Sequence, residues 1–241
     1  MNNYCRILMG GLVLLGLCRP GATQTFYGST GLLVHPSAFV SAPGSFHLNV
    51  TALTQKKGRM LNTYVPTSLA YGLTRRAEIG ALYVRHTGPE MPPHGHFGGF
   101  AKYQLVPDGT SHPAFALAGT YRNGDALESF VAGVASHNFL RNGRTFLTAH
   151  AGVKWGRTSD YWGYQTDIGE FIGLEYPFAP RLRLVGETST RFSFEHNAAS
   201  ALGLAWDAPN GSHVALGFVN IGRSDASRFF FGVGYPIGGR R

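Results

Sequence analysis

The polarity pattern of the chain is the feature that most constrains its fold, because it repeats with a period of two residues. In residues 144–156, for example, Leu147 and Val153 alternate with Thr148 and Lys154. Side chains on a strand point alternately to its two faces, so this period predicts β-strands. Gly, Pro, Asn and Asp interrupt the pattern, and no convincing helical stretch lies between the interruptions. The segments predicted to be strands are 44–54, 61–71, 75–86, 96–106, 113–122, 127–138, 144–156, 166–177, 181–190, 197–207, 212–221 and 227–237.

The composition of the two strand faces indicates what kind of β-protein this is. One face is apolar, as with Phe229, Phe231 and Val233, and the other is rich in Gly, Ala and small polar residues, as with Gly232 and Gly234. A soluble sandwich would instead place Lys, Glu and Thr opposite its apolar face. Charged residues make up only 14% of this chain, against about 25% in soluble domains. An apolar face suits lipid, and a face of small and polar residues suits the interior of a closed barrel.

Strand length agrees with a membrane barrel. Eleven residues at about 3.3 Å each, tilted by roughly 40°, rise about 28 Å, close to an apolar band of about 25 Å. No run of 18 apolar residues occurs, which excludes a helical membrane protein. We therefore expect an all-β fold, a single closed antiparallel transmembrane β-barrel of about 12 strands, with 10 to 14 possible. Segment 61–71 is the weakest strand, because Pro66 has no N–H for the ladder and predicts a bulge or a segment that does not cross.

The start of the chain has the pattern of a secretory signal. Arg6 precedes an apolar run from Ile7 to Leu17, which is too short to span a bilayer. We expect residues 1–24 to be a cleaved signal peptide (a buried N-terminal helix is the alternative), residues 25–43 a periplasmic N-terminal segment, and residues 44–241 an outer-membrane barrel in a Gram-negative-type bacterium. The two cysteines fall within the first 18 residues, so disulfide scaffolds, zinc-thiolate sites and cysteine nucleophiles are excluded from the mature chain.

The net charge of +8 does not indicate a nucleic-acid partner. Nucleic-acid binders gather Lys and Arg on one face or tail, whereas the pairs Lys56-Lys57, Arg75-Arg76 and Arg240-Arg241 are far apart here. The expected partners are outer-membrane lipid and lipopolysaccharide.

Several ionisable residues fall on the predicted inner face of the barrel. They are candidates for a polar track that takes an anionic sugar or an ion, or for an internal ion-pair network that plugs a narrow barrel. Barrels of about eight strands are filled by side chains and those of sixteen to eighteen hold channels, so twelve lies between, and we favour the network. The lumen-lining candidates are Glu78, Lys102, His150, Lys154, Glu175, Arg183, Glu187 and Arg228.

Enzymatic and metal-dependent functions find little support in the sequence. His150 and His137 lie on predicted strands and are possible bases, but no G-x-S-x-G elbow provides a nucleophile. We expect no enzyme, no catalytic residue, no cofactor and no metal site, with a barrel lipid hydrolase or acyltransferase as an alternative. In loop 157–165, Tyr161, Trp162 and Tyr164 are outer-loop candidates for contact with sugar or lipopolysaccharide, or members of an interfacial girdle.

Four motifs in order along the chain resemble the YjbH-like outer-membrane β-barrel proteins. They are GSTGLLVHPSA at 28–38, YGLTRRAEIG at 71–80, KYQLVP at 102–107 and GLEYPFAPRL at 173–182. The resemblance covers most of residues 26–182 and departs from the family at His35 and at 41–44. It implies a non-enzymatic role in export or surface handling of exopolysaccharide, or in envelope organisation, beside a periplasmic or lipoprotein partner. The remaining alternative is a secreted carbohydrate-binding β-sandwich.

Overall fold

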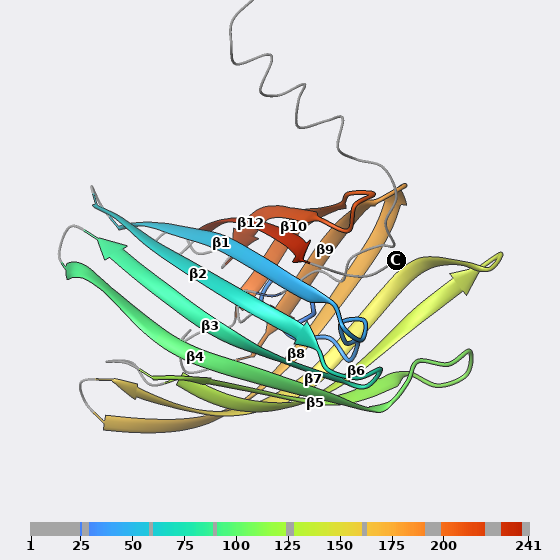
Figure 1. Ribbon diagram of the computed structural model, residues 1–241, viewed down its shortest axis with the longest axis horizontal. Coiled ribbons are helices and arrows are strands. Elements are labelled where there is room, and N and C mark those ends of the chain that lie inside the picture. Colours follow the sequence, from blue (N-terminus) through green and yellow to red (C-terminus); the bar gives the residue numbers. More distant parts are fainter. Residues whose placement is uncertain are drawn as a thin grey trace, which may run out of the picture.

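The computed structural model contains a single closed antiparallel barrel of twelve strands (Figure 1). It describes residues 25, 29–57, 60–88, 91–123, 128–160, 163–190, 199–219 and 228–237. The prediction of one closed antiparallel barrel of about twelve strands is confirmed. The strands are β1 (Phe46–Lys57), β2 (Met60–Gly72), β3 (Ala77–Gly88), β4 (Met91–Val106), β5 (Ala114–Arg122), β6 (Glu128–Arg141), β7 (Arg144–Asp160), β8 (Gly163–Ala179), β9 (Leu182–Ser189), β10 (Ala199–Asp207), β11 (His213–Val219) and β12 (Arg228–Ile237).

Each strand pairs with its neighbours in the sequence, and the first strand pairs with the last. The β1–β12 ladder runs from Phe46–Ile237 to Gln55–Arg228 and closes the wall. Figure 1 shows β12 beside β1, followed by β2, β3 and β4 across one side of the barrel. We call the end where β1 leads into β2 the loop end, and the opposite end, where β1 begins and β12 finishes, the turn end. Among the described residues, no helix is long and apolar enough to cross a membrane.

The alternation expected from the sequence appears as alternating exposure. In β7, the Trp155 side chain is 58% exposed on the outer surface, whereas its neighbour Lys154 is only 2% exposed. Ile168 in β8 is 69% exposed, and Phe171, which faces inward, is 2% exposed. Apolar residues thus cover the outside of the wall, and polar and small residues face the lumen, as in barrels that stand in lipid.

Pro66 lies within a strand of the wall. It occupies β2 and is paired with Val84 of β3. On its other side, the β1–β2 ladder keeps one register from Val50–Thr67 to Leu53–Tyr64, with the pairing interrupted between these pairs. Because Pro66 has no N–H, the pairing between β1 and β2 is interrupted beside it, but no bulge forms. The segment is therefore a complete strand of the wall.

The residues that precede β1 fold into the barrel. We call residues 29–45 the inner segment. Its backbone forms a tight turn, in which Leu32 N–H donates to His35 C=O at 3.0 Å and Ser37 N–H donates to Thr30 C=O at 3.1 Å. Sequence analysis predicts residues 25–43 as a periplasmic N-terminal segment; in the structure, residues 29–38 and Ser41 are buried by the wall, and Ala42 and Pro43 are exposed at the turn end. A three-residue apolar run, Leu32 to Val34, explains the difference, because it is buried only where the wall surrounds it.

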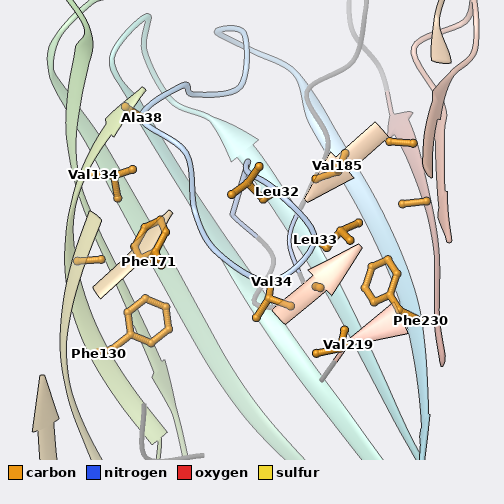
Figure 2. Close-up of a cluster of buried hydrophobic side chains, with 14 of the residues drawn as sticks. Leu32, Leu33, Val34, Ala38, Phe130, Val134, Phe171, Val185, Val219 and Phe230 are labelled. Carbon is orange, nitrogen blue, oxygen red and sulfur yellow. The ribbon is translucent and has the colours of Figure 1, made fainter. Parts of the chain in front are cut away.

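An apolar cluster joins the inner segment to both sides of the wall. Figure 2 shows Leu32, Leu33 and Val34 between one group of wall residues, which includes Phe171, and another, which includes Phe230. Wall glycines provide the space for these side chains. A Cβ on Gly173 would lie 2.2 Å from Leu32 Cδ1, and a Cβ on Gly203 would lie 2.9 Å from Leu33 Cδ1. The lumen is therefore packed around the inner segment.

Candidate functional site

The first anchor of the inner segment is a buried ion pair on neighbouring strands. Lys102 Nζ of β4 lies 3.2 Å from Glu78 Oε1 of β3. The Glu78 carboxylate accepts hydrogen bonds from the backbone N–H groups of Thr30 at 2.9 Å and Ser41 at 2.8 Å. The Lys102 ammonium donates to the backbone carbonyls of Thr30 at 2.7 Å and Ser37 at 3.2 Å. Buried charges need such partners, and here the inner segment provides them.

The second anchor is Glu187 of β9. Its carboxylate accepts hydrogen bonds from the backbone N–H groups of Val34 at 2.7 Å and His35 at 3.1 Å. It also lies 2.8 Å from Nδ1 of the His35 ring, which stacks on Phe171 with centroids 4.6 Å apart. Burial, and then the positive charge of Lys154, lower the pKa of His35 below its ordinary value of 6.5. The ring is therefore neutral at pH 7, with Nδ1–H as the donor to Glu187.

The third anchor is a chain of side chains that begins at Ser136 of β6. The hydroxyl of Ser136 accepts a hydrogen bond from Ala38 N–H at 2.8 Å and lies 2.8 Å from Nδ1 of His150. On the other side of the His150 ring, Nε2 lies 3.1 Å from Glu175 Oε1. With the Ser136 hydroxyl donating to Nδ1, the Nε2–H of His150 is the donor to Glu175.

The same chain continues to the turn end of the barrel. Arg183 forms an ion pair with Glu175 and another with Asp207, at 3.0 Å from Nη2 to Oδ2. A cavity of about 490 Å³ opens here, and Thr145, Thr148 and Arg181 are among the residues that line it. Polar contacts thus run from the backbone of the inner segment to the cavity at the turn end.

Serine, histidine and glutamate in this order invite comparison with a catalytic triad. A nucleophile must be able to reach a substrate carbonyl, yet Ser136 is 1% exposed and its oxygen already accepts the Ala38 N–H. The other sequence-predicted base, His137, lies apart from this chain, with its Nδ1 2.9 Å from Asp108 Oδ1. The contacts favour a role for Ser136 and His150 in holding the inner segment.

The eight sequence-predicted lumen residues divide into three groups. Glu78, Lys102 and Glu187 contact the inner segment directly, and His150, Glu175 and Arg183 connect to it through Ser136. The other two lie over aromatic rings of the inner wall: Lys154, whose charge also acts on His35, has its Nζ 5.8 Å from the centroid of the Phe130 ring, and Arg228 lies over the ring of Tyr64 at 5.5 Å.

Sequence reasoning missed the uncharged anchors. Ser136 binds the Ala38 N–H, and the Gln104 amide donates to the Ala38 carbonyl at 2.9 Å. Both residues occupy inward-facing positions of their strands, and the alternating pattern of the sequence indicates this. An uncharged polar residue at such a position, however, does not indicate which group it binds. Among the outer-loop candidates, Tyr161 and Trp162 lie outside the described residues, and only the backbone of Tyr164, within β8, is described.

Comparison with known proteins identifies the fold. No family model matches the sequence, and no curated protein matches it either. The solved structure of the KdgM porin is similar over 80% of this chain and 99% of its own, with a TM-score of 0.55 and 11% identity. The same porin in complex with disordered oligogalacturonate gives a TM-score of 0.55 and 10% identity over 79% of this chain and 99% of its own. The toluene transporter TbuX of Ralstonia pickettii covers 93% of this chain and 98% of its own at 9% identity and a TM-score of 0.46.

At such low identity, the likeness to KdgM concerns the fold alone. The chain therefore has the fold of outer-membrane porins, with its own inner segment seated in the lumen.

Proposed function

We propose that this chain is a non-enzymatic outer-membrane barrel whose lumen is closed by its inner segment and opens for the passage of surface polysaccharide. The observation that carries the proposal is the set of hydrogen bonds from lumen carboxylates to backbone N–H groups of the inner segment, at Glu78 and at Glu187. The apolar outer surface and the porin-like fold support the outer membrane as its location.

The way in which the inner segment is held supports a removable closure. Its apolar contribution comes mainly from Leu32, Leu33 and Val34, each worth about 1.5–3 kcal/mol on burial. The His35 ring also stacks on Phe171. The polar contacts of the segment are hydrogen bonds to wall groups, which water can replace once the segment leaves. Residues 29–41 take no part in the twelve-strand ladder, so their release leaves its strand pairing in place, whereas Gly44 and Ser45 hydrogen bond to Gly72 of β2.

Polysaccharide as the transported class is supported by the motifs at 28–38, 71–80, 102–107 and 173–182, which resemble the YjbH-like family. All four motifs contribute to the anchors, and Glu175 of the fourth belongs to the third anchor. Thr30 lies in the first, Glu78 in the second and Lys102 in the third, and all three meet at the first anchor. Several residues that carry the resemblance are therefore residues that hold the inner segment. We extend the proposal to a periplasmic or lipoprotein partner that receives the released segment.

Conductance of the reconstituted protein tests the closure. An ideal Cβ at Gly173 lies 2.2 Å from Leu32 Cδ1, so the double variant Leu32→Cys/Gly173→Cys places two thiols within disulfide reach. We expect small and infrequent openings for the wild type, larger steady conductance for a variant lacking residues 29–41, and no openings for the oxidised double variant until it is reduced.

Two results would overturn the closure. One is a correctly folded deletion variant, with a fast-migrating unboiled gel band, that conducts no better than the wild type. The other is an oxidised double variant that conducts as the reduced one does. A permanently closed barrel with a role in envelope organisation would then remain.

Polysaccharide passage needs a separate measurement in cells. Producing bacteria that carry the oxidised double variant should release less surface polysaccharide than cells with the reduced or single-cysteine protein, at equal amounts of barrel in the outer membrane. Equal release from all strains would overturn the polysaccharide assignment and leave the gated barrel in place.

A further inference from the structure

On the inner wall, Glu187 of β9 lies beside a recess that the inner segment fills. Glu187 and Gly173 of β8 are cross-strand partners. The Glu187 carboxylate accepts the backbone N–H groups of Val34 and His35 at 2.7 Å and 3.1 Å. Gly173 leaves room for Leu32, whose Cδ1 would lie 2.2 Å from a Cβ at that position. An acceptor of N–H groups therefore lies next to a space that takes a small apolar group.

The recess continues on the other side of β9. Gly203 of β10 is the cross-strand partner of Val185, and a Cβ on Gly203 would lie 2.9 Å from Leu33 Cδ1. Val185 and Glu187 are both buried and two residues apart, so they share the inward face of their strand. We call Gly173, Val185, Glu187 and Gly203 the amide site.

The other wall groups that hold the inner segment also bind the amides of its backbone. Glu78 accepts two N–H groups, and Ser136 accepts one. Lys102 donates to two backbone carbonyls, and the Gln104 amide donates to a third. The inner wall is therefore complementary to a chain that carries secondary amides next to small apolar groups.

We propose that the amide site binds the N-acetyl groups of an amino-sugar polysaccharide after the inner segment leaves. The inference rests on the proposed function and names the class of polysaccharide that passes. An acetamido group has an N–H for Glu187 and a methyl group for the recess between Gly173 and Gly203.

Two other classes of polysaccharide match the amide site less well. The carboxylate of a uronic acid has only acceptors, so it cannot replace the N–H groups on Glu187. A sugar with hydroxyl groups alone has donors for Glu187, but it brings no apolar group to the recess.

Hydrogen exchange of the full-length protein in detergent tests this preference. A glycan that takes the amide site displaces the inner segment, so it should speed amide exchange across residues 29–41 and leave exchange in the wall unchanged. We expect this effect with the hexamer of N-acetylglucosamine. Maltohexaose and hexagalacturonate should need at least tenfold higher concentrations for the same effect.

Two matched carboxylate variants test the role of Glu187. Glu187→Gln turns the carboxylate into an amide that can donate to a uronic acid, and Glu170→Gln makes the same change on the exposed outer face of β8. All glycans compete with the same inner segment, so the ratio of their half-maximal concentrations does not depend on how firmly it is held. The preference for the N-acetylated hexamer over hexagalacturonate should fall roughly tenfold in Glu187→Gln and stay at the wild-type value in Glu170→Gln.

Three results would overturn the amide site: equal half-maximal concentrations for the three glycans, no faster exchange with the N-acetylated hexamer, or an unchanged preference in Glu187→Gln. The glycan comparison on the wild type needs no variant, so it decides even if Glu187→Gln does not fold. Exchange is measured without reference to conductance. A barrel that opens but shows no preference would lose the amide site alone, and one that binds the hexamer but never conducts would lose the proposed passage.

Discussion

Ser136 shows how much a single residue contributes to seating the inner segment. Its hydroxyl serves two partners at once, the Ala38 N–H and the His150 ring. Ser136→Ala leaves the Ala38 N–H buried without an acceptor, which costs about 1–3 kcal/mol. We expect faster amide hydrogen exchange across residues 29–41 and unchanged exchange in the wall.

A serine on the outer surface provides the control for this change. Ser200→Ala removes an exposed contact with Thr188 at 3.1 Å, on the face of the wall opposite to the inner segment, and should leave the exchange of residues 29–41 unaltered. If Ser136→Ala exchanged like Ser200→Ala, the third anchor would contribute nothing to holding the segment.

His35 makes the seating of the inner segment dependent on pH. The ring faces Glu187 of β9, Phe171 of β8 and the charge of Lys154 of β7, and its pKa when seated lies below the ordinary 6.5. After release, His35 regains its ordinary pKa, so the released state binds the extra proton. Seating is therefore constant above about pH 6.5 and weakens as the pH falls from 6.5 toward the lowered pKa.

Conductance recorded at pH 8 and pH 5.5 measures this dependence. We expect more frequent openings at pH 5.5 for the wild type. His35→Asn keeps a donor for Glu187 without a titrating ring, so its ratio of openings at the two pH values should be close to one. If the openings of His35→Asn increased between pH 8 and pH 5.5 as much as those of the wild type, another titrating group would be responsible for the pH effect.

At the level of elements, the wall strands and the inner segment differ in how far the sequence predicts them. The strands follow from parity, because every second residue of a strand such as β5 is buried and the pattern repeats over its whole length. The apolar signals of the inner segment are two short runs, Leu32 to Val34 and Ala38 to Val40, and a run of three residues has no period. Its place depends on distant wall residues such as Gly173 and Glu187, which no local pattern connects to it.

A wall glycine should therefore control the inner segment. Gly173→Val directs a side chain into the position of Leu32, a clash that costs about 1–3 kcal/mol in packed interiors. We expect the segment to leave the lumen and become cleavable by protease, while the barrel keeps its fast-migrating unboiled gel band.

The matched control is Gly133→Val on β6, where an added Cβ meets no heavy atom within 4 Å. It should remain as protease-resistant as the wild type. Cleavage of both variants at equal rates would mean that the inner segment is accessible without any steric displacement.

At the scale of the whole molecule, we expect the barrel and the inner segment to be separable parts. The sequence predicts the barrel because twelve strands carry the same two-face pattern and close through the β1–β12 ladder. The sequence predicts the charged lumen-lining candidates because a charged residue such as Lys102 is easily recognised among the small residues of an inner strand face. It does not predict what those charges bind, since Glu78 and Thr30 meet across 48 residues of chain.

A double-mutant cycle measures this separation. Every hydrogen bond described for Glu187 goes to Val34 or His35 of the inner segment. Glu187→Gln should therefore lower the unfolding temperature of the full chain and have almost no effect in a chain that lacks residues 29–41, because the interaction it weakens is already absent. The coupling energy is the difference between the effects of Glu187→Gln on unfolding in the full chain and in the shortened chain. It should equal nearly the whole effect in the full chain, of the order of 1–3 kcal/mol for hydrogen bonds to a charged group. An equal effect in both backgrounds would mean that Glu187 stabilises the wall itself and that its contacts with the inner segment add no stability.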